Sequence, residues 1–175
     1  MEKEQPKIGL AILITAVVVG GAIYYFTNSK ISSETGNQYA NTSYNQTSKE
    51  YAVMSQELWS AMACSTWASK FDDQNETERL FMFGYEQGKK FLGAVRAEKI
   101  TEEDWQSEVP VGISLSLAGP SDDFILGVIS AHIQESSLNE VFYSNYDRSK
   151  LNSDDLQKII AENKYREGNC QLIGR

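Results

Sequence analysis

The sequence has few of the residues on which catalysis and metal binding most often depend. Its 175 residues include one histidine and two cysteines. Cys64 and Cys170 are 106 positions apart and form no Cys-x-x-Cys motif, so their spacing predicts neither a zinc site nor a redox pair. The chain also lacks the Gly-x-Ser-x-Gly, His-Glu-x-x-His and phosphate-loop motifs. We therefore expect no catalytic residue, no cofactor and no metal.

The charge balance argues against two classes of partner. From Lys49 onward there are 21 acidic and 13 basic residues, a net charge of −8. A surface with this excess of carboxylates is repelled by nucleic acid and by anionic lipid head groups. We expect no nucleic-acid partner.

A long apolar run near the start of the chain predicts a membrane anchor. Residues Ile8–Phe26 contain no charged side chain. As a helix they would span roughly 28 Å, close to the thickness of a bilayer core. A cleaved signal peptide is the alternative, with Gly20-Gly21-Ala22 as a small-residue cleavage site. The length of the run and its aromatic end favour an uncleaved anchor whose partner is the lipid bilayer.

The flanking cations predict the orientation of this anchor. Lys3 and Lys7 precede the run, whereas Lys30 alone follows within the next 20 residues. The positive-inside rule places residues 1–7 in the cytoplasm and the rest of the chain in the periplasm, attached to the inner membrane by a single span at residues 8–26. An even pair of cysteines in such an oxidising compartment predicts a disulfide between Cys64 and Cys170.

The sequence beyond the anchor divides into a linker and one domain. In residues 27–48, 15 of the 22 side chains belong to Asn, Gln, Ser or Thr, which is typical of a flexible tether. Residues 49–175 are enough for a single domain with its own core. We expect this domain to be all-α, a compact bundle of about four helices closed by one disulfide.

Capping residues and apolar spacing predict the four helices. The first covers residues 49–71; the second covers 76–99 after an N-cap at Asn75. The third and fourth begin after Ser121 and Ser153, each followed by two aspartates that favour a helix N-terminus. Gly168 is expected to stop the fourth helix. Residues 101–105 suggest a capped turn or short helix, and residues 111–120 either extended chain or a short helix.

Each predicted helix has an expected buried face. The predicted buried residues are Leu58, Ala61, Cys64, Ala68 and Phe71 in the first helix; Leu80, Phe81, Gly84, Gly88, Phe91, Leu92 and Val95 in the second; Phe124, Ile125, Val128, Ile129 and His132 in the third; and Leu156, Ile159 and Ile160 in the fourth.

Two glycines in the second helix need an explanation, because glycine in a helix interior costs about 1 kcal/mol relative to alanine. Gly84 and Gly88 lie four residues apart, on the same face as Phe81 and Phe91. We interpret them as helix-packing residues that let the first helix approach closely, with a ligand groove as the alternative.

One segment has the composition of a partner surface. Phe142, Tyr143, Tyr146 and Arg148 lie between the third and fourth helices. Protein interfaces are enriched in aromatic residues and arginine. The alternative is that these rings only cap the core.

The order of features resembles that of known small exported helical proteins. Cys64 lies on the first helix, Gly84, Tyr85 and Gly88 form a Gly-Tyr-x-x-Gly segment on the second, and Cys170 closes the domain. From Trp59 to Cys170 this order is similar to that of periplasmic immunity proteins, which neutralise secreted effectors that attack the cell wall, and of acid-resistance chaperones. The resemblance implies an all-helical fold and a protein-binding function.

These observations lead to one main functional hypothesis. We expect a membrane-anchored periplasmic domain that binds a protein partner, of immunity or inhibitor type, and is not an enzyme. An acid-activated chaperone is the second hypothesis, because acid would neutralise the carboxylates and leave the cations unopposed. An envelope enzyme is the third.

Overall fold

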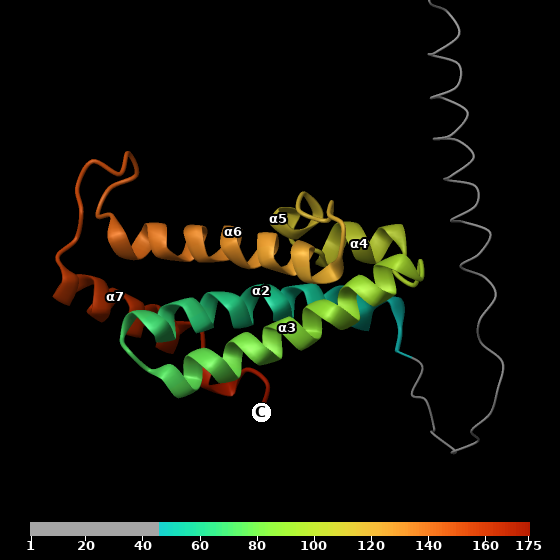
Figure 1. Cartoon of the computed structure of the whole chain (residues 1–175), viewed down its shortest axis with the longest axis horizontal. Coiled ribbons are helices and arrows are strands. Elements are labelled where there is room, and N and C mark those ends of the chain that lie inside the picture. Colours follow the sequence, from blue (N-terminus) through green and yellow to red (C-terminus); the bar gives the residue numbers. More distant parts are fainter. Residues whose placement is uncertain (1–45) are drawn as a thin grey trace, which may run out of the picture. The chain divides into compact units, whose positions relative to one another are not determined.

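The computed structural model describes residues 46–175, and this part of the chain is helical. Four long helices are α2 (Ser48–Lys70), α3 (Gln74–Arg96), α6 (Asp122–Phe142) and α7 (Asp154–Glu167). The short ones are α4 (Glu102–Glu108), α5 (Val111–Ser114) and the 3-10 turn η1 (Cys170–Leu172), and residues 46–175 contain no strand (Figure 1). The prediction of an all-α domain is confirmed for this part.

The predicted anchor at residues 8–26 lies outside the described residues, as does the predicted tether up to residue 45. Within residues 46–175, none of the helices combines the length and the apolar composition that a membrane crossing requires.

Each long helix begins after a residue whose side chain caps its N-terminus. Ser121 and Ser153 accept hydrogen bonds from the N–H groups of Phe124 and Leu156, as predicted. The predicted cap at Asn75 is wrong: α3 begins at Gln74, and Asp73 accepts from the N–H of Glu76. Asp72 has a φ of 67°, a left-handed turn that redirects the chain and lets α3 start earlier.

The boundaries at the two ends of the domain also differ slightly from the prediction. α2 begins at Ser48, one residue before the expected start, because Thr47 and Glu50 form a capping box. α7 stops at Glu167 with Gly168 as its cap, but the left-handed residue is Asn169, with a φ of 50°. Residues 111–114 form the short helix that was one of two alternatives for this segment.

The core lies between α2, α3 and α6. α3 returns antiparallel along α2, and α6 covers this pair (Figure 1). Its largest fully buried apolar side chains are Leu58, Leu80, Phe91, Ile113, Leu126, Ile129, Ile133 and Val141. Burial of each such side chain stabilises the fold by about 1.5–3 kcal/mol relative to its exposure.

Some predicted buried faces are rotated in the structure. Phe81 of α3 is 41% exposed. In α6 the inward residues are Ile125, Leu126, Ile129 and Ile133, whereas Phe124 and His132 are exposed. Apolar residues occur on two adjacent sides of these helices, so spacing alone does not decide which side faces the core.

Gly84 and Gly88 lie at close helix contacts. A β-carbon at Gly84 would be 3.1 Å from that of Ala61 in α2 and 3.4 Å from the Leu58 carbonyl oxygen. At Gly88 a β-carbon would collide with the Leu126 side chain of α6 and lie 3.3 Å from Leu58. The absence of side chains at these positions allows both neighbouring helices to approach α3.

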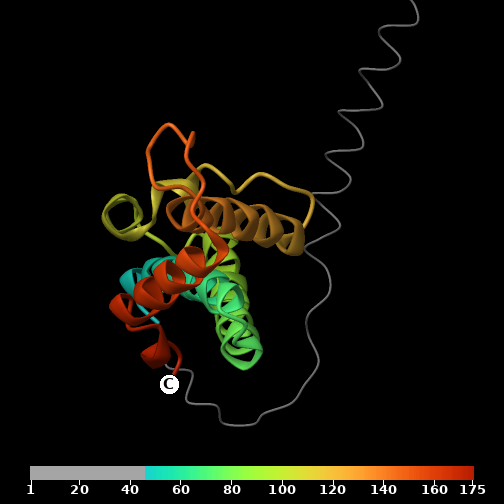
Figure 2. The ribbon, with the colours of Figure 1, turned by 90° about the vertical axis from the view of Figure 1, so that its left-hand side faces the viewer.

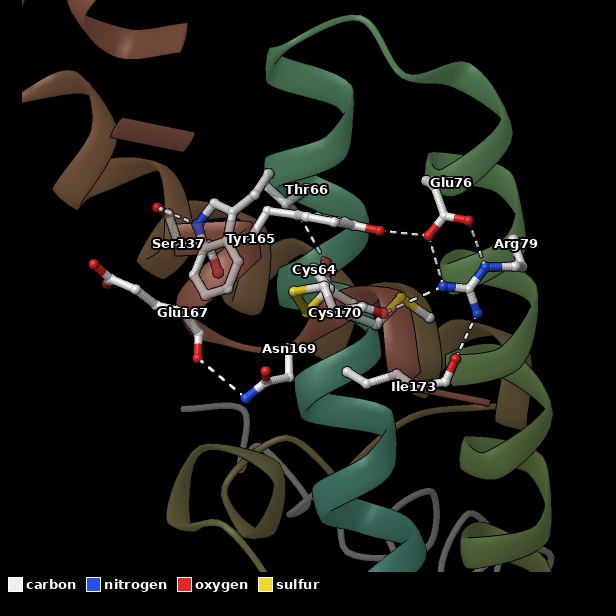
Figure 3. The surroundings of a disulfide bond; sticks show 12 residues. Cys64, Thr66, Glu76, Arg79, Ser137, Tyr165, Glu167, Asn169, Cys170 and Ile173 are labelled. Atoms are coloured by element: carbon white, nitrogen blue, oxygen red, sulfur yellow. Dashed lines mark hydrogen bonds and ion pairs between the residues drawn. A yellow bond between two sulfur atoms is a disulfide. The ribbon is translucent and has the colours of Figure 1, made fainter. Parts of the chain in front are cut away.

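A disulfide and an ion-pair network hold the C-terminal turn against α2 and α3 (Figure 3). Cys64 and Cys170 are at disulfide-bonding distance, with Cα atoms 5.6 Å apart, as predicted. Arg79 donates to the carbonyl oxygens of Cys170 and Ile173, at 3.2 and 2.5 Å, and to the carboxylate of Glu76. The disulfide and these hydrogen bonds therefore hold the C-terminal residues against α2 and α3.

The same network shifts two pKa values. Hydrogen bonds from Arg79 and then Tyr165 lower the pKa of Glu76 to about 2. Burial, followed by the hydrogen bond to Glu76, raises the pKa of Tyr165 to about 12. Glu76 therefore stays ionised, and Tyr165 neutral, over the whole physiological pH range.

Candidate functional site

The candidate site is the hairpin of residues 143–151, which joins α6 to α7. Tyr143 and Leu151 form an isolated antiparallel bridge. The N–H of Ser144 donates to the carbonyl oxygen of Lys150 at 3.0 Å. Figure 2 views the end of the bundle from which this hairpin projects.

Side chains within the hairpin fix its turn. Asn145 accepts from the N–H of Lys150 at 3.0 Å and donates to Ser149 at 2.8 Å. Asp147 accepts from the N–H of Ser149 at 3.0 Å, and this hydrogen bond holds the pKa of Asp147 below its usual value. Asn and Asp side chains that bond nearby backbone groups in this way stabilise turns. The hairpin thus has a defined conformation.

Two buried amides hold the base of the hairpin. Asn152 donates to the carbonyl oxygen of Val141 at 2.8 Å, near the C-terminal end of α6. Gln157 donates to the carbonyl oxygen of Asn152 at 2.7 Å. Helix ends leave carbonyl groups without intrahelical partners, and Asn152 satisfies one of them where water is excluded. Gln157 in turn satisfies the carbonyl group of Asn152.

A hollow of about 660 Å³ lies between the hairpin and the last turns of α6. We call it the hairpin hollow. Its lining residues are Ser136, Asn139 and Glu140 of α6 and Tyr143, Ser144, Asn145, Tyr146 and Arg148 of the hairpin. The lining combines two phenol rings, a guanidinium, a carboxylate and several small polar groups, which is a mixture suited to hydrogen bonding and aromatic contact with a polypeptide.

The structure brings together three of the four residues predicted as a partner surface. Tyr143, Tyr146 and Arg148 line the hairpin hollow, and the Tyr146 side chain is fully exposed. Phe142 is not among the lining residues; it is half-buried, with the Lys70 ammonium 4.8 Å from the centre of its ring. Phe142 therefore anchors the end of α6 on α2.

The guanidinium of Arg148 is available to a ligand. Its nearest carboxylate in residues 46–175 is that of Glu135, at 3.9 Å, and both side chains are more than half exposed. Such an exposed pair contributes little stability, on the order of 0–1 kcal/mol. Arg148 has a φ of 57°, a left-handed backbone conformation that is uncommon for a residue other than glycine.

The α6 residues of the hollow were not predicted. Ser136, Asn139 and Glu140 precede the predicted Tyr143 by seven, four and three residues. This spacing puts them on one side of a helix, next to the predicted partner surface. It was the only pattern in the sequence that could have indicated their part in the hollow. The signal is weak because a stripe of small polar residues is typical of any solvated helix face.

The other chemistry-bearing residues have structural partners. Ser116 Oγ lies 3.0 Å from His132 Nδ1 and joins the 115–119 loop to α6. Asp122 pairs with Arg96, and Asp123 accepts from Tyr85 at 2.7 Å and from Lys89 at 3.2 Å. Within residues 46–175, no cluster of three or more His, Cys, Asp or Glu side chains has a metal-binding arrangement.

A second, smaller hollow of about 270 Å³ lies between α3 and α6. Phe81 and Tyr85 line it from α3, and Gly127 and Ala131 line it from α6. Gly84 and Gly88 do not line it. The two α3 glycines thus face neighbouring helices, and the alternative of a glycine-floored ligand groove has no support in this hollow.

No protein-family model, curated protein or solved structure matches this chain. The resemblance to periplasmic immunity proteins and acid-resistance chaperones remains a prediction.

Proposed function

We propose that this protein is a membrane-attached, periplasmic binding domain that contacts a protein partner through the hairpin hollow and has no catalytic activity of its own. The observation that carries the proposal is the pairing of the fully exposed Tyr146 with Arg148 beside a hollow of about 660 Å³. Buried aromatic and arginine side chains contribute most of the binding energy in protein interfaces.

The internal bonds of the hairpin support a role in recognition. A loop that is ordered before binding loses less conformational entropy when a partner immobilises it. The turn bonds of Asn145 and Asp147 and the buried amides of Asn152 and Gln157 provide this order. An exposed tyrosine also has few rotatable bonds, so its ordering costs little.

The hairpin lies beside one end of the long helix α2. Ser48, at the start of α2, bonds Thr101 and Asp104 beside α4. Lys70, at the other end of α2, contacts Phe142 beside the hairpin. These ends are about 34 Å apart, since a helix rises about 1.5 Å per residue. The hairpin is therefore at the opposite end of α2 from Ser48.

The proposed membrane attachment is tested by the mass of the protein extracted from membranes. We expect the chain to retain residues 1–30, because residues 8–26 are an uncleaved anchor. An N-terminus at Ile23 would contradict the anchor and support a cleaved signal peptide.

The proposed binding surface is tested by photo-cross-linking in intact cells. A photoreactive amino acid replaces Tyr146 in the full chain, and in the control it replaces Leu115, which is 82% exposed beside α5. We expect one dominant cross-linked protein from position 146 and none from position 115. Equal cross-linking from both positions, or none from position 146, would refute the hairpin as the partner surface.

A further inference from the structure

α7 buries one polar residue and exposes two large apolar ones. Gln157, a polar residue, is only 3% exposed, whereas Leu156 and Ile159 are 43% and 55% exposed. Surface helices normally bury their apolar stripe and present their polar side to solvent. The prediction that Leu156 and Ile159 face inward is therefore wrong, whereas Ile160, the third residue of the predicted face, is half-buried.

The hairpin explains this rotation of α7. Gln157 points inward because its amide bonds the carbonyl oxygen of Asn152, and Asn152 in turn bonds that of Val141. Ala161, one helical turn later, is fully buried on the same side. Satisfying the polar groups at the hairpin base thus requires Leu156 and Ile159 to face outward.

The outward side of α7 also carries opposite charges at its two ends. Asp155, Ile159, Glu162 and Arg166 are exposed and recur at intervals of four, three and four residues, which places them in one stripe. The helix dipole favours acids in the first turn and bases in the last. It does not account for the two exposed aliphatic side chains between the charges.

We propose that this stripe of α7 binds the same stripe of a second copy of the chain, in an antiparallel arrangement about a two-fold axis. Antiparallel pairing brings Asp155 of one copy opposite Arg166 of the other, and the symmetry makes this contact twice. The Ile159 side chains of the two copies meet near the axis, flanked by Leu156. The ends of the stripe are therefore charge-complementary, whereas Glu162 lies beside Ile159 of the other copy near the axis, where the two like carboxylates weaken the contact.

The size of the contact predicts a weak dimer. A 14-residue helix is about 21 Å long, and one helix pair of this length buries less than the about 1,200 Å² typical of stable interfaces. Attachment of both copies to one membrane would raise their effective concentration, which favours weak contacts. The dimer is therefore best detected with the full chain in cells.

The first test places a photoreactive amino acid at Ile159 in the full chain. Two differently tagged copies are expressed together, and Phe124, which is exposed on α6, is the control position. We expect a product of twice the monomer mass that carries both tags from position 159, and none from position 124. Cross-linking of position 159 to a different protein, or no product, would overturn the proposal.

The second test exchanges the charges, using an otherwise normal chain with the photoreactive group at position 159. Asp155→Arg alone and Arg166→Asp alone each bring like charges together at both symmetric contacts, so we expect the dimer yield to fall by about tenfold. The double variant Asp155→Arg/Arg166→Asp restores the attraction and should restore the yield. Thermal melting of each variant checks folding. An unchanged yield in the single variants, or no recovery in the double variant, would refute the antiparallel contact.

Discussion

Two regions of the domain are built in different ways. Where α2 and α3 run together, contact is close and apolar: Gly84 and Gly88 admit the neighbouring helices, and the disulfide of Cys64 and Cys170 closes the assembly. At the hairpin, buried amides and turn bonds hold the backbone, and Tyr146 faces outward. The structure of the first region depends on close side-chain packing, and that of the hairpin depends on hydrogen bonds.

This difference separates stability from recognition. Exposed side chains that make few contacts in the folded domain contribute little to its stability, so they can serve a partner. In a closely packed region, by contrast, each added methylene is felt by the neighbouring helices. Variants of the packed region should therefore change stability, and variants of the hairpin should change binding.

Removal of the disulfide has the largest expected effect on stability. We expect Cys64→Ala/Cys170→Ala to cost about 2–5 kcal/mol, because the unfolded chain loses a cross-link over a long loop. The melting temperature should fall by about 10 °C or more. The matched measurement is the melting temperature of the unmodified protein, determined by calorimetry before and after reduction of its disulfide. Equal melting temperatures would show that the bond does not close the domain.

Overpacking at the α3 glycines has the next largest effect. Gly88→Leu inserts a side chain where a β-carbon would already collide with Leu126, so we expect a loss of about 1–3 kcal/mol or more. Gly93→Ala is the control, because a β-carbon at that position of α3 meets no atom within 4 Å. The control should stabilise the protein by about 0.5–1 kcal/mol through helix propensity. A stable Gly88→Leu variant would show that α3 does not contact its neighbours closely.

Acid should weaken the C-terminal network in a defined pH range. The folded pKa of Glu76, about 2, lies below its ordinary value of 4.5, so its stabilisation is present at neutral pH and is lost as the pH falls from about 4.5 to about 2. We expect Glu76→Gln to cost about 1–2 kcal/mol at pH 7, since the ion pair is partly exposed. The melting-temperature difference from the unmodified protein should shrink as the pH falls through this range and vanish below about pH 2. A difference that is constant with pH would contradict the role of this carboxylate.

Much of the helical architecture is predictable from local signals. Ser121 and Ser153 are strong caps followed by paired aspartates, and the structure starts α6 and α7 where these residues indicate. The disulfide pair is predictable because the chain has only two cysteines. These inferences use neighbouring residues or composition, and they do not depend on how the helices are rotated.

The orientation of α7 and the extent of the candidate site were not predictable in this way. Apolar periodicity assigns Leu156 and Ile159 to the core, but the bonds of Asn152 and Gln157 turn that side outward. The contribution of Ser136 and Asn139 to the hollow depends on how the hairpin folds back beside α6. Both features result from hydrogen bonds between segments, which a helical repeat does not encode.

The most direct test of the separation between stability and recognition measures both on one hairpin variant. Tyr146→Ser/Arg148→Asn removes the exposed ring and the guanidinium, and asparagine tolerates the left-handed backbone at position 148. Leu115→Ser is the matched exposed control beside α5. Melting temperature and the amount of cross-linked partner recovered from intact cells are measured for each. We predict that the free energy of unfolding of the hairpin variant stays within about 0.5 kcal/mol of that of the unmodified protein. The variant should nevertheless lose its cross-linked partner. Full partner recovery, or a loss of recovery that comes only with a large fall in melting temperature, would contradict the account.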